Sequence, residues 1–220
     1  MISVFICNFS KMYHVEKRIK KWIEYGDENV TLHLVGLDIA EIPELPPNLK
    51  HLECKYCHNL KKLPELPPNL QTLQCLYCYD LKELPELPES LQILYCDNCP
   101  IEKLPGLPES LRELYCYDCP IEDLPKLPPN LIELKCFYCR ELKELPELPP
   151  NIQNLNCSYC PIKELPKLPP NLQRLDCSYC NIKEIQELPP KLKKLFCSTM
   201  NRKDCPIKSL PPILPAYIRL

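Results

Sequence analysis

The chain of 220 residues lacks an excess of charge of either sign and lacks a long hydrophobic run. It has 27 basic and 29 acidic residues, so no overall field attracts nucleic acid or an anionic membrane. No segment approaches the roughly 18 consecutive apolar residues of a membrane span. The apolar run Met1–Cys7 follows no basic residue and soon meets Asn8, which argues against a signal peptide. These absences predict an intracellular, cytoplasmic protein that binds neither nucleic acid nor membrane.

Catalytic signatures are also missing from the sequence. No paired carboxylates, no nucleophile beside a base and no phosphate-binding loop stand out. The histidines, His14, His33, His51 and His58, share no spacing with one another or with an acidic residue. We therefore expect no enzymatic activity, no catalytic residue and no cofactor.

Glycine is scarce, with three residues, whereas proline occurs 28 times. Such a proline content is typical of disordered chains, but 45% of the residues are hydrophobic, which is too many for a disordered protein. The prolines must therefore lie in ordered turns that recur along the chain.

A repeat of 20 or 21 residues accounts for both the prolines and the leucines. Each unit reads LxxLxCxxC, then one or two residues, then Leu or Ile, and then xxLPxLPxN or a close variant. The complete units begin at Leu49, Leu70, Leu91, Leu111, Leu131, Ile152 and Leu172. A degenerate unit covers residues 29–48. Another unit starts at Leu192, carries about five extra residues around Met200–Asp204 and regains register at Cys205.

Positions are numbered here from the first Leu or Ile of each unit. The alternation in LxxLxC predicts a short strand whose positions 4 and 6 face inward and whose positions 3, 5 and 7 face outward. The segment LPxLPxx cannot be helical, because proline lacks an amide donor and fixes φ. One unit cannot bury its leucines alone, so consecutive units must stack. The predicted fold is a solenoid with a parallel β-sheet on the concave side and an extended, polyproline-like convex side.

This spacing resembles the leucine-rich-repeat superfamily, and the phrase LPxLPxxLxxL resembles the short repeats of the bacterial type III effector subclass represented by YopM and the IpaH proteins. The resemblance covers residues 29 to about 217 and implies a leucine-rich-repeat fold. IpaH proteins carry a C-terminal ubiquitin-ligase domain with a nucleophilic cysteine. We do not expect that activity here, because the chain ends at Leu220, directly after the repeats. The chain also departs from the subclass by having Cys at positions 6 and 9, where an aliphatic residue and Asn are common.

The segment before the repeats has the spacing of an amphipathic helix over residues 11–25. Its apolar residues are Met12, Val15, Ile19, Trp22 and Ile23, with Ser10 as the expected N-cap and Gly26 as the stop. A solenoid needs a cover over its first hydrophobic face, and this helix is suitably placed. We therefore expect a capping segment at 1–28, a solenoid of about nine units at 29–217, and a short C-terminal tail at 218–220.

Seventeen cysteines, most of them in CxxC pairs, would indicate zinc or redox chemistry in many sequences. Here position 6 faces inward, and position 9 is where the leucine-rich-repeat superfamily uses Asn or Cys to satisfy backbone groups in the turn. Free cysteine behaves as a small apolar residue with a weak donor. We expect two columns of buried thiols and no metal site. A four-thiolate metal site between adjacent units is the minor alternative.

Outward positions 5 and 7 form columns across the predicted sheet. They bring together Leu76, Tyr95, Tyr115, Tyr117 and Phe137, with Ile93 and Ile132 at the margin. Aromatic side chains dominate protein interfaces, so we predict that a partner protein binds the concave face through these five residues. The tyrosines that recur at position 8 are interpreted as a packing ladder at the rim. An alternative makes the protein an adaptor that links a bound partner to a ubiquitin ligase or other machinery through residues 1–28.

Overall fold

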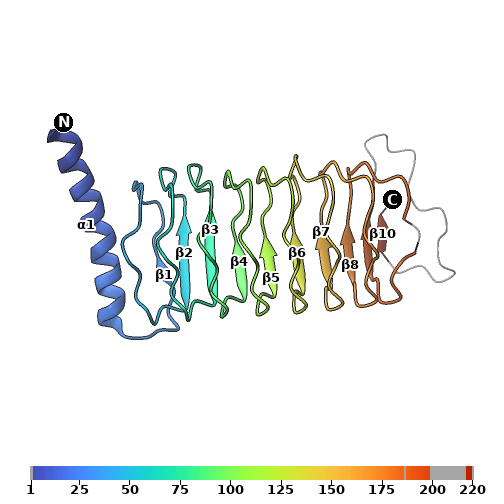
Figure 1. Cartoon of the computed structure of the whole chain (residues 1–220), viewed down its shortest axis with the longest axis horizontal. Coiled ribbons are helices and arrows are strands. Elements are labelled where there is room, and N and C mark those ends of the chain that lie inside the picture. Colours follow the sequence, from blue (N-terminus) through green and yellow to red (C-terminus); the bar gives the residue numbers. More distant parts are fainter. Residues whose placement is uncertain (1, 186, 199–216, 220) are drawn as a thin grey trace.

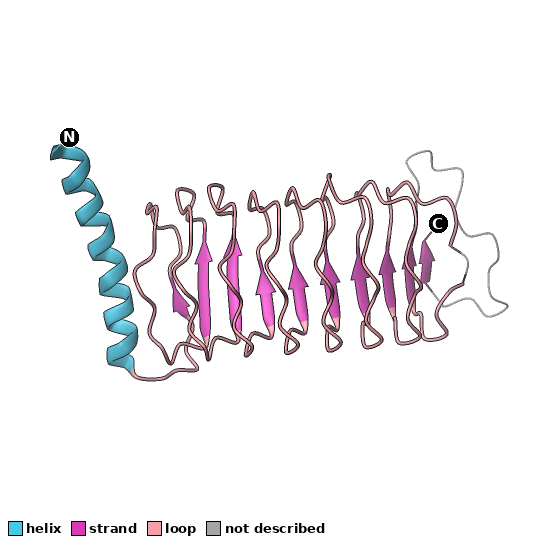
Figure 2. Cartoon of the chain, viewed as in Figure 1, coloured by secondary structure: helices cyan, strands magenta, loops and turns pink. Residues whose placement is uncertain are grey.

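A computed structural model describes residues 2–185, 187–198 and 217–219 of the chain. One helix, α1 (Ile2–Tyr25), precedes a parallel sheet in which the ten strands of the described residues follow one another in sequence order (Figures 1 and 2). The strands are β1 (Leu32–His33), β2 (His51–Lys55), β3 (Thr72–Leu76), β4 (Ile93–Tyr95), β5 (Glu113–Tyr115), β6 (Glu133–Lys135), β7 (Asn154–Asn156), β8 (Arg174–Asp176), β9 (Lys194–Phe196) and β10 (Tyr217–Arg219). The predicted leucine-rich-repeat solenoid is confirmed.

The strands pair so that equivalent repeat positions lie side by side. Leu52 pairs with Leu73, and Leu73 with Leu94, because each of these leucines holds position 4 of its unit. A one-residue slip would turn the leucines outward, so burial of one face fixes this register. The sequence placed 218–220 in a tail, whereas Tyr217–Arg219 continues the sheet by pairing with β9. The predicted insertion at Met200–Asp204 and the return to register at Cys205 lie outside the described residues.

The core is one continuous cluster that runs the length of the solenoid. In the unit that starts at Leu111, the side chains at positions 1, 4, 6 and 9 (Leu111, Leu114, Cys116 and Cys119) are at most 2% exposed. The degenerate unit contributes in the same way, since its predicted Leu32, Leu34, Leu37, Ile39, Ile42 and Leu45 are all buried. Each unit thus buries its apolar residues only against its neighbours, as expected for a solenoid.

Proline shapes the return to each strand. The Leu49 amide donates to the Pro46 carbonyl at 3.1 Å, and the same turn recurs between Leu70 and Pro67 at 3.0 Å. The second proline of the phrase LPPNL stands at the second position of this four-residue turn, where its fixed φ is favourable. The prolines are therefore ordered, as the composition predicts.

In each of the seven complete units a residue with left-handed backbone follows the strand at position 8, which the sequence analysis did not anticipate. The residues concerned have φ between 53° and 60° and are Tyr56, Tyr77, Asn98, Asp118, Tyr138, Tyr159 and Tyr179; Gly36 of the degenerate unit has φ 66°. Each continues the ladder, as when the Tyr138 amide donates to the Ser158 carbonyl at 2.9 Å. A tyrosine in this region is strained, whereas Asn, Asp and Gly tolerate it.

The position-8 tyrosines stack on one another from unit to unit. Ring centroids lie 4.2 Å apart between Tyr138 and Tyr159, 4.4 Å apart between Tyr159 and Tyr179, and 5.1 Å apart between Tyr56 and Tyr77. This confirms the predicted packing ladder. Stacking of this kind stabilises by about 0.5–1.5 kcal/mol per pair, which offsets the backbone strain at these positions.

Position 8 allows a direct test of this strain at Asp118, whose side chain is exposed. Asp118→Gly should leave the free energy of unfolding within about 1 kcal/mol of the natural chain, because glycine adopts the left-handed region without a Cβ clash. Asp118→Val should be less stable than Asp118→Gly by about 1–2 kcal/mol or more. Urea denaturation measures both. A valine variant as stable as the glycine variant would show that position 8 carries no such constraint.

Helix α1 covers the edge of the sheet next to β1 (Figure 1). Val15, Ile19 and Trp22 are buried, and the Trp22 indole Nε1 donates to the Val30 carbonyl at 2.7 Å. The Arg18 guanidinium donates to the carbonyls of His33 and Val35 at 3.3 and 3.2 Å, which satisfies part of the sheet edge. The predicted cap is therefore observed.

Three details of α1 differ from the prediction. The helix begins at Ile2, so Ser10 lies inside it rather than at its N-cap; no proline or glycine interrupts residues 2–10, and serine disfavours a helix only weakly. Ile23 is 57% exposed, because the buried stripe follows the spacing of Val15, Ile19 and Trp22 and Ile23 lies beside it. Met12 is only partly buried.

The end of α1 agrees with the prediction. The Gly26 amide donates to the Trp22 carbonyl, and Gly26 has a left-handed backbone with φ 74°, which confirms the helix stop. No helix among the described residues is long and apolar enough to cross a membrane.

Candidate binding surface

The side chains at positions 3, 5 and 7 form the outward surface of the sheet, called here the sheet face. Tyr95 of β4 pairs with Tyr115 of β5, and their rings stack with centroids 4.2 Å apart and planes at 14°. Two residues further along, the Tyr117 and Phe137 rings stack at 4.4 Å and 8°. Four of the five predicted binding residues therefore form two stacked pairs on neighbouring strands.

Leu76 lies apart from these pairs. Leu76 and Tyr117 both hold position 7, but their units are separated by one further unit, and Asp97 holds position 7 of that unit. Tyr77 reaches toward Tyr117 instead, and their hydroxyl oxygens are 3.3 Å apart. All five predicted residues are partly buried rather than fully exposed. Each aromatic ring covers part of its neighbour, so the sheet face exposes less apolar surface than the sequence alone suggests.

A polar frame holds the first aromatic pair. The Tyr95 hydroxyl donates to Glu113 Oε2 at 2.5 Å, and Lys135 Nζ donates to the Tyr115 hydroxyl at 2.9 Å. Lys135 Nζ also lies 2.8 Å from Glu133 Oε1 and 4.0 Å from the centre of the Tyr115 ring. Partial burial, followed by the hydrogen bond with Glu113, raises the pKa of Tyr95, so its phenol stays neutral and fixed.

The sequence reasoning missed Glu113 and Glu133 because it followed only columns 5 and 7. Both glutamates hold position 3, which faces the same side of the sheet, and they pair in register between β5 and β6. Reading column 3 together with column 5 would have placed a carboxylate beside each tyrosine. The sheet face is therefore a set of aromatic rings held in place by charged neighbours.

Asp97 is a buried carboxyl group at the margin of the aromatic pairs. It is 4% exposed, and its Oδ1 accepts a hydrogen bond from the Tyr117 amide at 3.1 Å. Burial raises the pKa of Asp97 to about 7, although the Tyr117 amide acts in the opposite direction. This residue is therefore partly protonated near neutral pH.

Asp97 should make stability depend on pH. Its pKa in the folded chain, about 7, exceeds its ordinary value of 3.8, so between these values the folded chain holds a proton that the unfolded chain has lost. The free energy of unfolding should fall as pH rises through this window, by at most about 1.4 kcal/mol per pH unit from this residue. Asp97→Asn keeps the acceptor for the Tyr117 amide and should remove that contribution.

Urea denaturation at pH 5, 6 and 7 measures the effect. The difference in stability between Asp97→Asn and the natural chain should grow in favour of the variant as pH rises. The exposed Asp80, changed to Asn, serves as the control and should show a constant difference. Parallel pH profiles for Asp97→Asn and the natural chain would rule out a raised pKa at Asp97.

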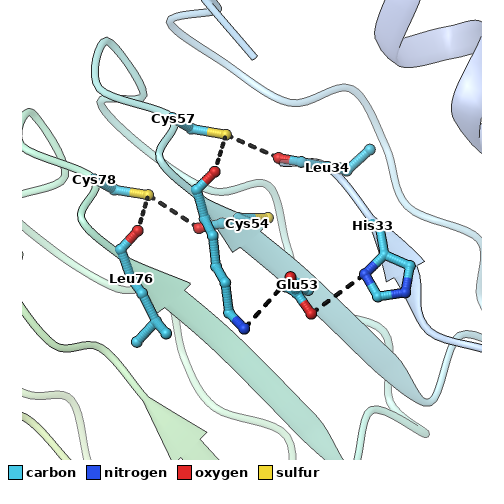
Figure 3. Close-up of polar contacts among 8 residues, drawn as sticks. His33, Leu34, Glu53, Cys54, Cys57, Leu76 and Cys78 are labelled. Carbon is cyan, nitrogen blue, oxygen red and sulfur yellow. Dashed lines mark hydrogen bonds and ion pairs between the residues drawn. The ribbon is translucent and has the colours of Figure 1, made fainter. Parts of the chain in front are cut away.

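The cysteines form two buried columns, as predicted. The cysteines from Cys54 to Cys197 are all free thiols and all buried. At position 9 the thiol donates to a carbonyl of the preceding unit: Cys57 to Leu34 at 2.9 Å and Cys78 to Cys54 at 3.1 Å (Figure 3). The same bond recurs from Cys119 to Cys96 at 3.1 Å and from Cys139 to Cys116 at 3.0 Å. Position 9 therefore satisfies backbone groups, as predicted, but these acceptors stand at position 6 of the preceding unit rather than in the turn.

The pKa is raised at the inward position-6 thiols from Cys54 to Cys157, which favours their neutral form. Burial raises the pKa of Cys136 well above its ordinary value, and for Cys75 a hydrogen bond with Cys54 acts first and burial second. A neutral, inaccessible thiol is a poor nucleophile and a poor metal ligand. Among the described residues, no group of three or more His, Cys, Asp or Glu side chains is arranged to hold a metal ion.

Substitutions in one CxxC pair test the role of the thiols. Cys116→Ala with Cys119→Ala should cost about 1–3 kcal/mol of stability, the range of a modest cavity. Cys119→Ser should cost less than Cys116→Ser, because a hydroxyl at position 9 can still donate to the Cys96 carbonyl, whereas the Cys116 thiol is fully buried and donates to no backbone carbonyl of the described residues. Chemical denaturation measures these differences, and binding on the sheet face should survive.

Thiol labelling provides the second readout. The cysteines from Cys54 to Cys197 in the native chain should react slowly with a thiol reagent, and the denatured chain should react at all seventeen. Fast labelling of most CxxC pairs in the native chain, or unfolding under reductant or chelator, would contradict the buried-column interpretation.

Comparisons with known proteins agree with this architecture. The sequence profile of the Leucine Rich Repeat family matches residues 171–195. A comparison with curated proteins gives no match. Among solved structures, YopM from Yersinia enterocolitica WA-314 superposes with a TM-score of 0.65 at 32% identity, over 82% of this chain and 43% of that protein. YopM from Yersinia pestis, a leucine-rich effector protein, gives a TM-score of 0.66 at 28% identity, over 87% and 65% of the two chains.

A more distant structure shares the fold alone. The leucine-rich repeat protein from Bacteroides ovatus ATCC 8483 has a TM-score of 0.55 at 20% identity, over 73% of this chain and 46% of that one. The chain therefore spans less than two thirds of the length of each of these three proteins.

Proposed function

Because the chain is a leucine-rich-repeat protein with repeats similar to those of the effector YopM, we propose that it binds a partner protein through its sheet face. The observation that carries the proposal is the pair of aromatic stacks, Tyr95 with Tyr115 and Tyr117 with Phe137. Aromatic rings at the centre of a surface bury a large area at low cost in side-chain entropy. No catalytic step is required of such a scaffold.

Preorganisation strengthens the case for these rings as anchors. Glu113 and Lys135 already hold the two phenol groups of the first stack, so binding immobilises little that is free beforehand. Losses of side-chain freedom cost roughly 0.5–1.5 kcal/mol for each flexible side chain at an interface, and a rigid surface avoids much of that cost. The ring faces and edges that remain accessible would contact the partner, and Leu76 would lie at the margin.

The small side chains beside the aromatic stacks leave room for a partner. In the next two units Ser158 and Ser178 occupy position 7, where both are buried, and their amides donate to the side chains of Asn156 and Asp176. The serine side chains therefore project less from the sheet than the neighbouring rings of Tyr117 and Phe137. A protein loop or helix that packs against the rings could continue over this lower region.

The adaptor alternative has less support. The apolar stripe of α1 is used by Val15, Ile19 and Trp22 against the first unit, which leaves the segment the role of a cap. Recruitment of a ubiquitin ligase or other machinery would have to use the remaining, charged surface of the helix.

Alanine at Tyr95, Tyr115 and Phe137 together should weaken the affinity for the partner by about tenfold or more. Hot-spot aromatic residues each contribute on the order of 2 kcal/mol to the free energy of binding. The partner is first captured on the immobilised natural chain from a cytoplasmic extract, then purified and titrated by calorimetry. Tyr13, Tyr25 and Tyr79, which are exposed and lie outside the sheet face, supply the matched triple alanine control.

The control variant should bind as tightly as the natural chain. Both variants should have thermal unfolding midpoints above the assay temperature, so that they stay folded during the measurement. If the sheet-face variant holds every captured partner at full strength while folded, the partner does not use these rings and the proposal fails.

A further inference from the structure

A groove lies where the chain enters β5 to β9, beside the sheet face. It has a volume of about 370 Å³ and is called here the edge groove. Its lining residues come from the last position of a unit and from position 2 of the next: Arg112, Asn130, Ile132, Asn151, Gln153, Asn171, Gln173 and Lys191. None of the described residues that line it is acidic. From this surface we infer that the edge groove binds an extended acidic segment of a partner protein.

Side-chain amides form the floor of the groove. Asn151 and Asn171 each donate Nδ2 to a proline carbonyl of the preceding unit at 3.0 Å, and Gln173 donates Nε2 to Gln153 Oε1 at 3.2 Å. These bonds fix the amides in place. They leave Asn151 Oδ1 as an acceptor and Gln153 Nε2 as a donor without a partner among the described residues. An extended backbone offers the complementary amide and carbonyl groups.

The cations at the two ends of the groove are not neutralised. The Arg112 side chain makes no hydrogen bond or ion pair within the described part of the chain. Lys191 donates to the amide oxygen of Asn171 at 2.8 Å. Lys193 does not line the groove but lies next to it, where it donates to the amide oxygen of the lining residue Gln173 at 2.8 Å. Some lysines elsewhere in the solenoid are paired with glutamates, as Lys50 is with Glu28, Lys62 with Glu41 and Lys135 with Glu133. The nearest carboxylates on β5 and β6, Glu113 and Glu133, are engaged by Tyr95 and Lys135.

The spacing of the cations sets the spacing of the acids in the ligand. Arg112 and Lys193 hold position 2 in units that are four repeats apart, so roughly 19 Å separates them at about 4.8 Å per strand. An extended chain covers that span in about six residues at roughly 3.3 Å each. A segment with two acidic residues about six positions apart would place one carboxylate at Arg112 and the other at Lys191 and Lys193. This inference rests on the proposed function, since it assigns part of the partner to a second surface.

Fluorescence polarisation with the full chain tests the edge groove. The probe is a labelled twelve-residue peptide of Ser, Thr and Val with glutamates at its second and eighth positions. Arg112→Gln, Lys191→Gln and Lys193→Gln together should weaken its binding by about tenfold or more, because each removes a charge-assisted contact. Lys163→Gln, Lys167→Gln and Lys183→Gln remove equal charge from exposed sites outside the groove and should change binding by less than about twofold.

Three comparisons decide the outcome. A peptide with its two glutamates adjacent should bind more weakly than the spaced peptide, and so should a single-stranded oligonucleotide of equal charge. Equal losses in the two triple variants, or equal binding of the adjacent-glutamate peptide, would overturn the inference. Tighter binding of the oligonucleotide, lost in the groove variant, would also overturn it and make the groove a polyanion site.

The aromatic variant separates this inference from the proposed function. Alanine at Tyr95, Tyr115 and Phe137 should leave the affinity for the spaced peptide unchanged, since none of these residues lines the groove. If the spaced peptide does not bind the natural chain while the captured partner still depends on the aromatic rings, the edge groove fails and the sheet face stands. If the spaced peptide binds the natural chain but the aromatic variant keeps its full affinity for the captured partner, the sheet-face proposal fails and the edge groove stands.

Discussion

The parallel register between consecutive units is the constraint on which every surface of this protein depends. Backbone amides hold it along the strands, and in the complete units a position-9 thiol reaches back to a carbonyl of the preceding unit, as Cys119 does to Cys96. Because equivalent positions meet, a residue placed at one position in successive units becomes a column on one surface. The leucines and thiols form the core columns, and variation at the outward positions creates local sites without altering the fold.

Residue differences at the outward repeat positions divide the surface of the solenoid into regions of different chemistry. Around β4 to β6 the rings of Tyr95, Tyr115, Tyr117 and Phe137 stack, and glutamates and a lysine hold them. Toward β9, position 7 carries serines, cations lie near the edge groove, and Phe196 lies beside Arg174. Position 8 shows the same principle in the turn, where Asn98 and Asp118 interrupt the tyrosine ladder with residues that tolerate a left-handed backbone.

Much of the fold could be predicted from the sequence, because the repeat specifies local geometry and neighbour contacts together. The inward leucines, the buried cysteine columns and the capping role of Trp22 all follow from spacing. The left-handed backbone at position 8 was missed because five tyrosines obscured it, although Asn98 and Asp118 carry the signal. The start of α1 at Ile2 was missed because the apolar run at the N-terminus was weighed only as a signal peptide, although Ile2, Phe5, Ile6 and Phe9 have the spacing of a helix face. The partial burial of Tyr95 and Tyr115 could not be predicted, since it depends on rotamers that Glu113 and Lys135 select.

The most direct test of the central claim, that the sheet face contacts the partner, is hydroxyl-radical footprinting of the natural chain with and without its captured partner. Side-chain oxidation reports accessibility at individual rings. We expect the partner to reduce oxidation at Tyr95, Tyr115, Tyr117 and Phe137, while Tyr13 and Tyr25, which are exposed on α1, stay unchanged. Protection confined to α1 or to the proline-rich side, with the four sheet-face rings oxidised as fast as in the free chain, would contradict the account.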